Sequence, residues 1–147
     1  MITIDRADDL GVVRDLIVEY AESTGVDLSF QNFQNEIETL DSFYELLLIA
    51  RDGEHVAGCI ALRKLDAATC EMKRLYVRPS FRGSGAGRLL AIRLIDEARQ
   101  RGYKRMRLDT LPSMHSAMKL YESLGFVDIE PYRYNPIENS RYMELSL

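Results

Sequence analysis

Three glycines at alternating positions, Gly83, Gly85 and Gly87, form the segment of this chain with the clearest chemical meaning. Glycine lets a backbone approach a ligand closely, and a helix N-terminus offers unpaired N–H groups with a partial positive charge. The glycines are followed by apolar residues at helical spacing, namely Leu89, Leu90, Ile92, Leu94, Ile95 and Ala98. A glycine loop that opens a helix predicts a binding site for phosphate or pyrophosphate.

Two common phosphate-binding motifs do not fit this loop. A P-loop contains a Gly-Lys pair, which is absent from the chain, and the dinucleotide motif G-x-G-x-x-G requires glycine where Arg88 stands. Arg78, Arg82 and Arg88 surround the loop with positive charge, which favours an anionic ligand. The structural alternative is a glycine-rich turn that only caps a helix.

The elements around the loop are expected to place it at one edge of a sheet. Cys70–Val77 is rich in strand formers and stops at Pro79, which has no N–H for a strand ladder. After the helix, Arg105–Leu111 alternates as a strand. A strand, helix and strand in this order predict a right-handed crossover with one parallel pair, and a ligand belongs at the carboxyl end of that pair.

Two motifs give the chain a family resemblance. The pattern R-x-x-G-x-G from Arg82 to Gly87, with its preceding strand, resembles the coenzyme A loop of the GNAT acyl-CoA N-acetyltransferase superfamily. The segment from Ala117 to Phe126 resembles the family's later A-x-x-x-Y-x-x-x-G-F signature. One position departs from the family pattern, because Met114 stands where many members have an asparagine that contacts the cofactor.

The resemblance covers nearly the whole chain and implies a single domain over residues 1–147. We expect an α/β fold whose mixed, mostly antiparallel sheet holds one splayed parallel strand pair and is flanked by about four helices. The strands are expected at Ile2–Ile4, Leu46–Ala50, Val56–Leu65, Cys70–Val77, Arg105–Leu111, Phe126–Ile129 and Tyr142–Leu147. The helices are expected from a cap at Asp8 or Asp9 to Glu22, and at Phe33–Leu40, Gly85–Arg101 and Pro112–Leu124.

The resemblance also implies acetyl-CoA as the co-substrate. Its pyrophosphate is expected on the loop, and its pantetheine arm on the unpaired edge of the preceding strand, where a backbone N–H near Tyr76 or Val77 would stabilise an oxyanion. The expected cofactor-binding residues are Leu75, Tyr76, Val77, Arg82, Gly83, Ser84, Gly85, Ala86, Gly87 and Arg88.

Transfer of an acetyl group from a thioester to an amine, through a tetrahedral intermediate, needs a base and benefits from an acid. Glu71 starts the splayed strand and is the candidate base, acting directly or through water. The structural alternative is a glutamate paired with Lys73 or Arg74. Tyr121 matches the family tyrosine that often protonates the thiolate, although it also belongs to an apolar helix stripe and is alternatively a core residue.

The acceptor site is expected from the link between the first two helices and from the last strands. The candidate substrate-binding residues are Asp27, Phe30, Tyr132, Arg133 and Tyr134. Asp27 is suited to attract an ammonium and Arg133 to hold a carboxylate, a combination that fits an amino acid or a similar zwitterion. The sequence therefore predicts a small-molecule amine acceptor without naming it.

Composition limits the remaining possibilities. The chain has 147 residues and a formal net charge of −4, which disfavours nucleic-acid binding. It contains no apolar run long enough to span a membrane, and we expect a cytoplasmic protein. Cys59 and Cys70 are expected to be buried and reduced, and the two cysteines and two histidines form no zinc pattern, so no metal is expected. A homodimer is possible through exposed strand edges.

Two other functions compete with acetylation of a small amine. One is acetylation of a protein N-terminus or lysine, which requires an open groove beside Leu75. The other is a non-catalytic acyl-CoA sensor, which would keep the glycine loop without needing Glu71 or Tyr121.

Overall fold

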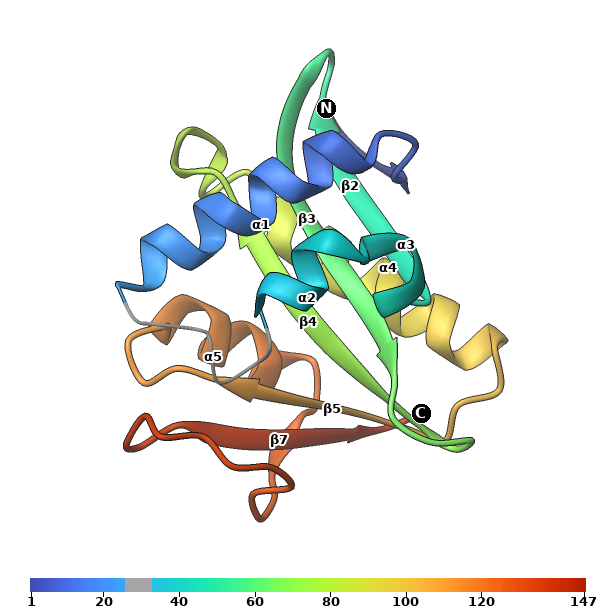
Figure 1. Cartoon of the computed structure of the whole chain (residues 1–147), viewed down its shortest axis with the longest axis vertical. Helices are drawn as coiled ribbons and strands as arrows, with labels where there is room; N and C mark the ends of the chain where they lie inside the picture. The colour runs from blue at the N-terminus through green and yellow to red at the C-terminus, as the bar shows by residue number, and fades with distance from the viewer. Residues whose placement is uncertain (26–32) are drawn as a thin grey trace.

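A computed structural model describes residues 1–25 and 33–147 of the chain. Its strands are β1 (Ile2–Arg6), β2 (Leu46–Asp52), β3 (His55–Lys64), β4 (Thr69–Val77), β5 (Arg105–Thr110), β6 (Val127–Asp128) and β7 (Arg141–Ser146). Its helices are α1 (Leu10–Thr24), α2 (Phe33–Glu38), α3 (Leu40–Phe43), α4 (Ala86–Gln100) and α5 (His115–Ser123), with a short 3₁₀ turn at Pro79–Phe81. The expected order of elements is thus confirmed (Figure 1).

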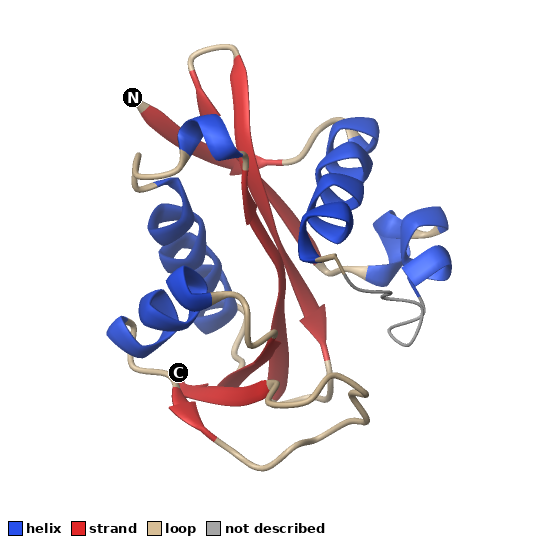
Figure 2. Ribbon diagram, turned by 90° about the vertical axis from the view of Figure 1, so that its left-hand side faces the viewer, coloured by secondary structure: helices blue, strands red, loops and turns tan. Residues whose placement is uncertain are grey.

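Seven strands form one sheet in the order β1-β2-β3-β4-β5-β7-β6. The pair β4–β5 is parallel, whereas the other neighbouring strands are antiparallel. Helices cover both faces of the sheet (Figure 2). Residues of α1 and α3 share one buried cluster with one face, and residues of α4 and α5 share another with the opposite face. The expected mixed sheet with one parallel pair is confirmed.

The parallel pair opens after three residues. Pairing between β4 and β5 runs from Thr69–Arg105 to Glu71–Arg107 and then stops, while β5 stays paired with β7 up to Thr110. The rest of β4, from Met72 to Val77, therefore has no ladder partner on its β5 side. The expected splay is confirmed, and it opens the sheet beside the carboxyl ends of both strands.

A bulge in β4 lies at the start of this opening. The register with β3 shifts between Cys59 and Ala61, so that β4 contains one extra residue there. Arg74 has a φ of 58°, in the left-handed region that residues other than glycine rarely adopt. Bulges of this kind bend a strand and redirect its side chains. As a result, Lys73 and Arg74 both lie on the side of the sheet that carries α1 and α2.

Local sequence explains most helix boundaries and two differences from expectation. Asp9 caps α1 by accepting a hydrogen bond from the N–H of Gly11 at 2.9 Å, and Gly25 ends α1 with a φ of 67°. The helix expected over Phe33–Leu40 is instead two short helices, α2 and α3, separated at Thr39. The helix expected from Pro112 begins at His115, because a turn comes first in which the Met114 N–H donates to the Leu111 carbonyl at 3.0 Å.

None of the helices within the described residues is long and apolar enough to cross a membrane.

Candidate active site

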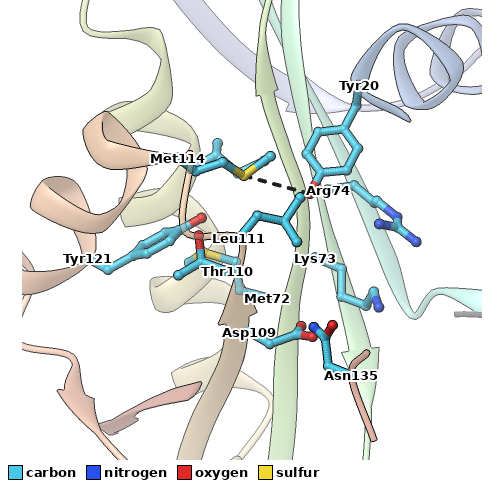
Figure 3. Close-up of a pocket in the computed structure, with 11 residues that line it drawn as sticks. Tyr20, Met72, Lys73, Arg74, Asp109, Thr110, Leu111, Met114, Tyr121 and Asn135 are labelled. Atoms are coloured by element: carbon cyan, nitrogen blue, oxygen red, sulfur yellow. Dashed lines mark hydrogen bonds between the residues drawn. The ribbon is translucent and has the colours of Figure 1, made fainter. Parts of the chain in front are cut away.

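A pocket lies where β4 and β5 diverge (Figure 3). It contains about 500 Å³ of empty space, part of which is open to solvent. The strands supply Met72, Lys73, Arg74 and Leu75 from β4, and Asp109 and Thr110 from β5. Leu111, Met114 and Tyr121 follow β5 in the chain, while Tyr20 comes from α1 and Asn135 from the segment before β7.

The pocket reaches both faces of the sheet. Tyr121 belongs to α5 and packs in the cluster that contains α4. Tyr20 packs on the opposite cluster, with α1. Both side chains line the same pocket because the splayed strands leave the sheet unpaired between them. Two molecules approaching from opposite faces can therefore meet here without crossing a strand ladder.

The glycine loop lies at the N-terminus of α4 and exposes its backbone. Gly83 and Gly85 have φ values of 83° and 88°, which explains why glycine stands at these positions. Gly85 is the N-cap of α4 and makes no side-chain capping hydrogen bond. Within the described residues, the N–H groups of Gly83, Gly85, Gly87 and Arg88 donate to no protein acceptor. Such a row of free donors at a helix N-terminus is suited to a pyrophosphate.

The other predicted loop residues have the following positions. Ser84 accepts a hydrogen bond from the N–H of Ala86 at 3.3 Å. The exposed Arg82 donates from Nε to the Val77 carbonyl at 3.4 Å, and the exposed Arg88 donates to Ser123 Oγ at 2.9 Å. Arg78 is instead paired with Glu19 of α1 at 2.7 Å.

Glu71 lies inside the protein and does not line the pocket. Its side chain is 0% exposed. The Tyr132 hydroxyl donates to Oε2 at 2.5 Å, and Arg133 donates to the same oxygen. Burial, followed by the adjacent carboxylate, raises the pKa of Tyr132 above its ordinary value, so this hydroxyl keeps its proton. The structure brings Glu71, Tyr132 and Arg133 together, and this contact ties the segment before β7 to the sheet.

The second oxygen of Glu71 faces Lys73. Oε1 has no hydrogen-bond partner among the described residues, and the Lys73 ammonium lies 4.0 Å from it. The Lys73 side chain is 4% exposed and lines the pocket. Burial is the main cause that lowers the pKa of Lys73 to about 8. Strand β4 therefore buries the carboxylate of Glu71 and, two residues later, places the ammonium of Lys73 in the pocket.

Asp109 carries an unpaired carboxylate oxygen. Its Oδ2 is buried and has no hydrogen-bond partner within the described part of the chain. Figure 3 shows Asp109 near Asn135 and Lys73 at one end of the pocket, with Tyr121 on the other side of β5. Buried polar atoms without a partner are uncommon in proteins and require an explanation.

Sequence reasoning did not assign Lys73 or Asp109 to the site. Lys73 was visible as one of three charged residues in the strand Cys70–Val77, two positions after Glu71. Asp109 was visible as a carboxylate at the carboxyl end of the strand expected in the parallel pair. The sequence does not show that both side chains face one pocket, because this depends on the separation of β4 from β5 beyond Glu71 and Arg107.

The remaining predicted residues lie at different distances from the pocket. Leu75 and Tyr121 line it, whereas Tyr134 is 79% exposed and does not. Tyr76 is buried on the α1 side and its hydroxyl donates to Glu19 at 3.3 Å. The predicted Asp27 and Phe30 lie outside the described residues.

Burial raises the pKa of Tyr121 above its ordinary value, so its hydroxyl remains protonated at neutral pH. No group of three or more His, Cys, Asp or Glu suited to a metal ion occurs among the described residues. The expectation of a site without metal stays a prediction.

Comparisons with known proteins address the family directly. The model of the acetyltransferase (GNAT) family matches residues 12–126. An uncharacterised N-acetyltransferase of Schizosaccharomyces pombe is 41% identical, with 95% of this chain and 89% of that protein covered. An IAA acetyltransferase of Azospirillum brasilense is 34% identical over 76% of this chain and 74% of its own length. A ribosomal protein bS18-alanine N-acetyltransferase of Escherichia coli is 35% identical over 63% of this chain and 62% of its own.

Solved structures agree with the family match. The crystal structure of an acetyltransferase from Streptococcus agalactiae has a TM-score of 0.81 and 26% identity, covering 99% of this chain and 98% of that one. An acetyltransferase from Salmonella typhimurium, solved with acetyl-CoA, has a TM-score of 0.71 and 26% identity over 99% of this chain and 93% of its own. The chain therefore belongs to the acetyltransferase (GNAT) family and is an N-acetyltransferase that uses acetyl-CoA.

Proposed function

We propose that this enzyme transfers the acetyl group to a primary amine of a small molecule by direct attack of the amine on the thioester carbon. The observation that carries the proposal is the pocket between β4 and β5, which is lined from both faces of the sheet. The buried ammonium of Lys73 and the half-buried carboxylate of Asp109 would give a small polar acceptor fixed partners inside it.

The glycine loop fits the cofactor. We propose that the free N–H groups of Gly83, Gly85, Gly87 and Arg88 hold the pyrophosphate, because they are unpaired and point from the positive end of α4. The pantetheine arm would lie along the edge of β4 at Leu75–Val77, which has no partner strand on its β5 side. The reacting thioester would then reach the pocket from the face that carries α4 and α5.

Two carboxylates are candidates for accepting the proton of the amine. Glu71, the base expected from the sequence, is separated from the pocket by Lys73 and holds Tyr132 and Arg133. Asp109 lines the pocket and has an unpaired Oδ2. We assign proton acceptance to Asp109, because the amine proton becomes acidic as the C–N bond forms and this carboxylate is directly accessible. Glu71 is assigned the positioning of Lys73 and of the segment before β7.

Tyr121 is proposed to protonate the departing sulfur. It lines the pocket from α5 and keeps its proton at neutral pH, because burial raises its pKa. A thiolate of pKa about 8.5 accepts a proton from a phenol only with help from orientation. The bound ammonium first loses one proton to solvent, because only the free amine has a lone pair for attack. A C–N bond then forms and the C–S bond breaks, while Asp109 receives the second amine proton and Tyr121 supplies the thiol proton.

A second candidate is acetylation of a protein N-terminal amine. It is favoured by the 35% identity to the bS18-alanine N-acetyltransferase. In that case the peptide would enter from the side of Tyr20 and Asn135, and free amines would react more slowly than peptides ending in the same residue.

The test is the release of coenzyme A from acetyl-CoA with a panel of acceptors. The panel contains amino acids, polyamines, aminoglycosides, arylamines and peptides with free N-termini or lysines, with a blank lacking acceptor. Faster release with free amines than with peptides supports the proposal, and the reverse order supports the second candidate. Release no faster than the blank with every acceptor, from protein that binds acetyl-CoA, contradicts both and favours a sensor.

A further inference from the structure

We infer that the acceptor carries a carboxylate close to its amine, and that Lys73 binds the carboxylate while Asp109 binds the amine. The inference rests on the proposed small-molecule activity and names the substrate class of the same pocket. It comes from the charges in the pocket that the protein itself leaves without a hydrogen-bonded partner.

Two arginines close to Lys73, Arg74 and Arg133, are each already paired with a carboxylate of the protein. Arg74 donates to both carboxylate oxygens of Glu36, from Nε at 2.8 Å and from Nη2 at 2.7 Å. Figure 3 shows its guanidinium turned away from the end of the pocket that holds Asp109. Arg133, which sequence analysis assigned to a substrate carboxylate, donates to Glu71 instead. Arg74 is thus held in a buried ion pair, and Arg133 is anchored on Glu71 and does not line the pocket.

Lys73, unlike the two arginines, donates no hydrogen bond to a carboxylate within the described residues. Its ammonium lies 4.0 Å from Glu71 Oε1, which is too far for a hydrogen bond. Among the described residues it donates no hydrogen bond, although its side chain is 4% exposed and an ammonium has three donors. An enclosed ammonium without hydrogen bonds is costly, and a ligand anion in the pocket would satisfy it.

Asp109 supplies the opposite charge. Its buried Oδ2 lacks a partner, and its carboxylate is close enough to Lys73 to interact electrostatically. The two residues come from β4 and β5, beyond the last paired residues of these strands. Figure 3 shows both side chains at the same end of the pocket.

A zwitterion satisfies both groups at once, whereas a simple amine satisfies only Asp109 and leaves Lys73 with its long ion pair to Glu71 and no hydrogen bond from the described residues. Because leaving a buried polar group unpaired costs about as much as a tenfold or larger change in binding, the pocket should discriminate strongly. The chemical class that fits is a free amino acid or a similar small molecule with a carboxylate a few bonds from its amine.

The experiment compares matched acceptors on the wild-type enzyme by initial rates of coenzyme A release. Each L-amino acid is paired with its decarboxylated amine and its methyl ester, for example phenylalanine with phenethylamine and phenylalanine methyl ester, or histidine with histamine. We expect kcat/KM for at least one amino acid to exceed that of both partners by about tenfold or more. Decarboxylated amines or esters that react equally well, or faster, in every pair overturn the inference.

The variant Lys73→Met tests whether Lys73 causes the preference for amino acids over their decarboxylated amines. Methionine has a side chain of similar length without the charge. We expect the variant to bring the ratio of kcat/KM for the amino acid to kcat/KM for the decarboxylated amine close to one, by raising KM for the amino acid. Lys64→Met is the matched control, because Lys64 is exposed at the end of β3 and should keep the wild-type ratio. A ratio that survives in Lys73→Met contradicts the role of Lys73.

Failure of this inference and failure of the proposed function give different results. If amines without a carboxylate are good acceptors and amino acids are not, the proposed activity stands and this inference fails. If no free amine raises the rate above the blank, the proposed function fails and this inference fails with it. The wild-type comparison requires no variant, so a folding defect in Lys73→Met leaves the test intact.

Discussion

The Lys73 ammonium and the Glu71 carboxylate, two residues apart on β4, lie 4.0 Å apart inside the protein. The carboxylate also receives hydrogen bonds from Tyr132 and Arg133 through its other oxygen. The negative charge is thus shared among three partners, and the lysine obtains only a long ion pair. This arrangement keeps Lys73 in the pocket as a poorly satisfied cation and has consequences for stability as well as for binding.

Lys73 should make the stability of the fold depend on pH in the alkaline range. Burial, followed by the charge of Arg74, lowers its pKa from an ordinary 10.5 to about 8, and the carboxylates of Glu71 and Asp109 oppose this shift. Between these values the unfolded chain binds more protons than the folded chain, so this group adds stability as pH rises. Relative to Lys73→Met, the wild type should gain up to about 3 kcal/mol in free energy of unfolding from pH 7.5 to 10.5.

Denaturant unfolding of the two proteins across this pH range measures the difference. Lys64→Met serves as the control, because Lys64 is exposed and the stability of this variant should follow the same pH dependence as the wild type. Parallel curves for wild type and Lys73→Met would show that Lys73 titrates near its ordinary value in the folded protein.

Replacement of the two carboxylates separates the base from the positioning residue. Asp109→Asn should lower kcat by about 100-fold or more, because an amide cannot take up the proton, with little effect on acetyl-CoA affinity. Glu71→Gln should raise KM for the acceptor and lower the melting temperature, because Arg133 loses its buried anion. Steady-state kinetics and thermal unfolding measure both effects. A larger loss of kcat in Glu71→Gln, with KM and stability unchanged, would make Glu71 the base.

Removal of the Tyr121 hydroxyl should slow turnover without weakening cofactor binding. We expect Tyr121→Phe to lower kcat by at least about tenfold, in line with the loss of a general acid. Because burial raises the pKa of this phenol, its ionisation should produce no decline in the wild-type rate at neutral to mildly alkaline pH. Tyr103→Phe is the control, since Tyr103 donates to Glu45 outside the pocket. Equal rates for wild type and Tyr121→Phe would assign Tyr121 to the core alone.

A negative side chain in the glycine loop should abolish binding of acetyl-CoA. Gly85 has a φ of 88° and caps α4, so Gly85→Asp adds strain and places a carboxylate where the pyrophosphate is expected. Gly53→Asp is matched in residue type and in positive φ, at 61°, but lies in the β2–β3 hairpin. Calorimetric titration with acetyl-CoA should show binding only for the Gly53 variant and the wild type. Normal affinity in Gly85→Asp refutes the assignment of the loop.

Much of the fold was predictable because its signals are local. The glycines and the helix after them, the Asp9 cap, the apolar strands and the order of elements all depend on residues near one another in the chain. The boundaries that differed, such as the division of α2 from α3 at Thr39, depend on hydrogen bonds within single turns that apolar periodicity does not encode.

The sequence by itself determined the mixed sheet with its parallel pair and the family, and it placed the glycine loop at the start of α4. Only the tertiary structure decided which charged side chains face the pocket. Glu71 and Arg133 are 62 positions apart and Arg74 and Glu36 are 38 apart, yet each pair is in contact. These contacts engage the two arginines, whereas the Lys73 ammonium and Asp109 Oδ2 have no hydrogen-bond partner among the described residues. The reason is physical: a buried charge takes whichever opposite charge the packing brings to it, and the chain order does not record that choice.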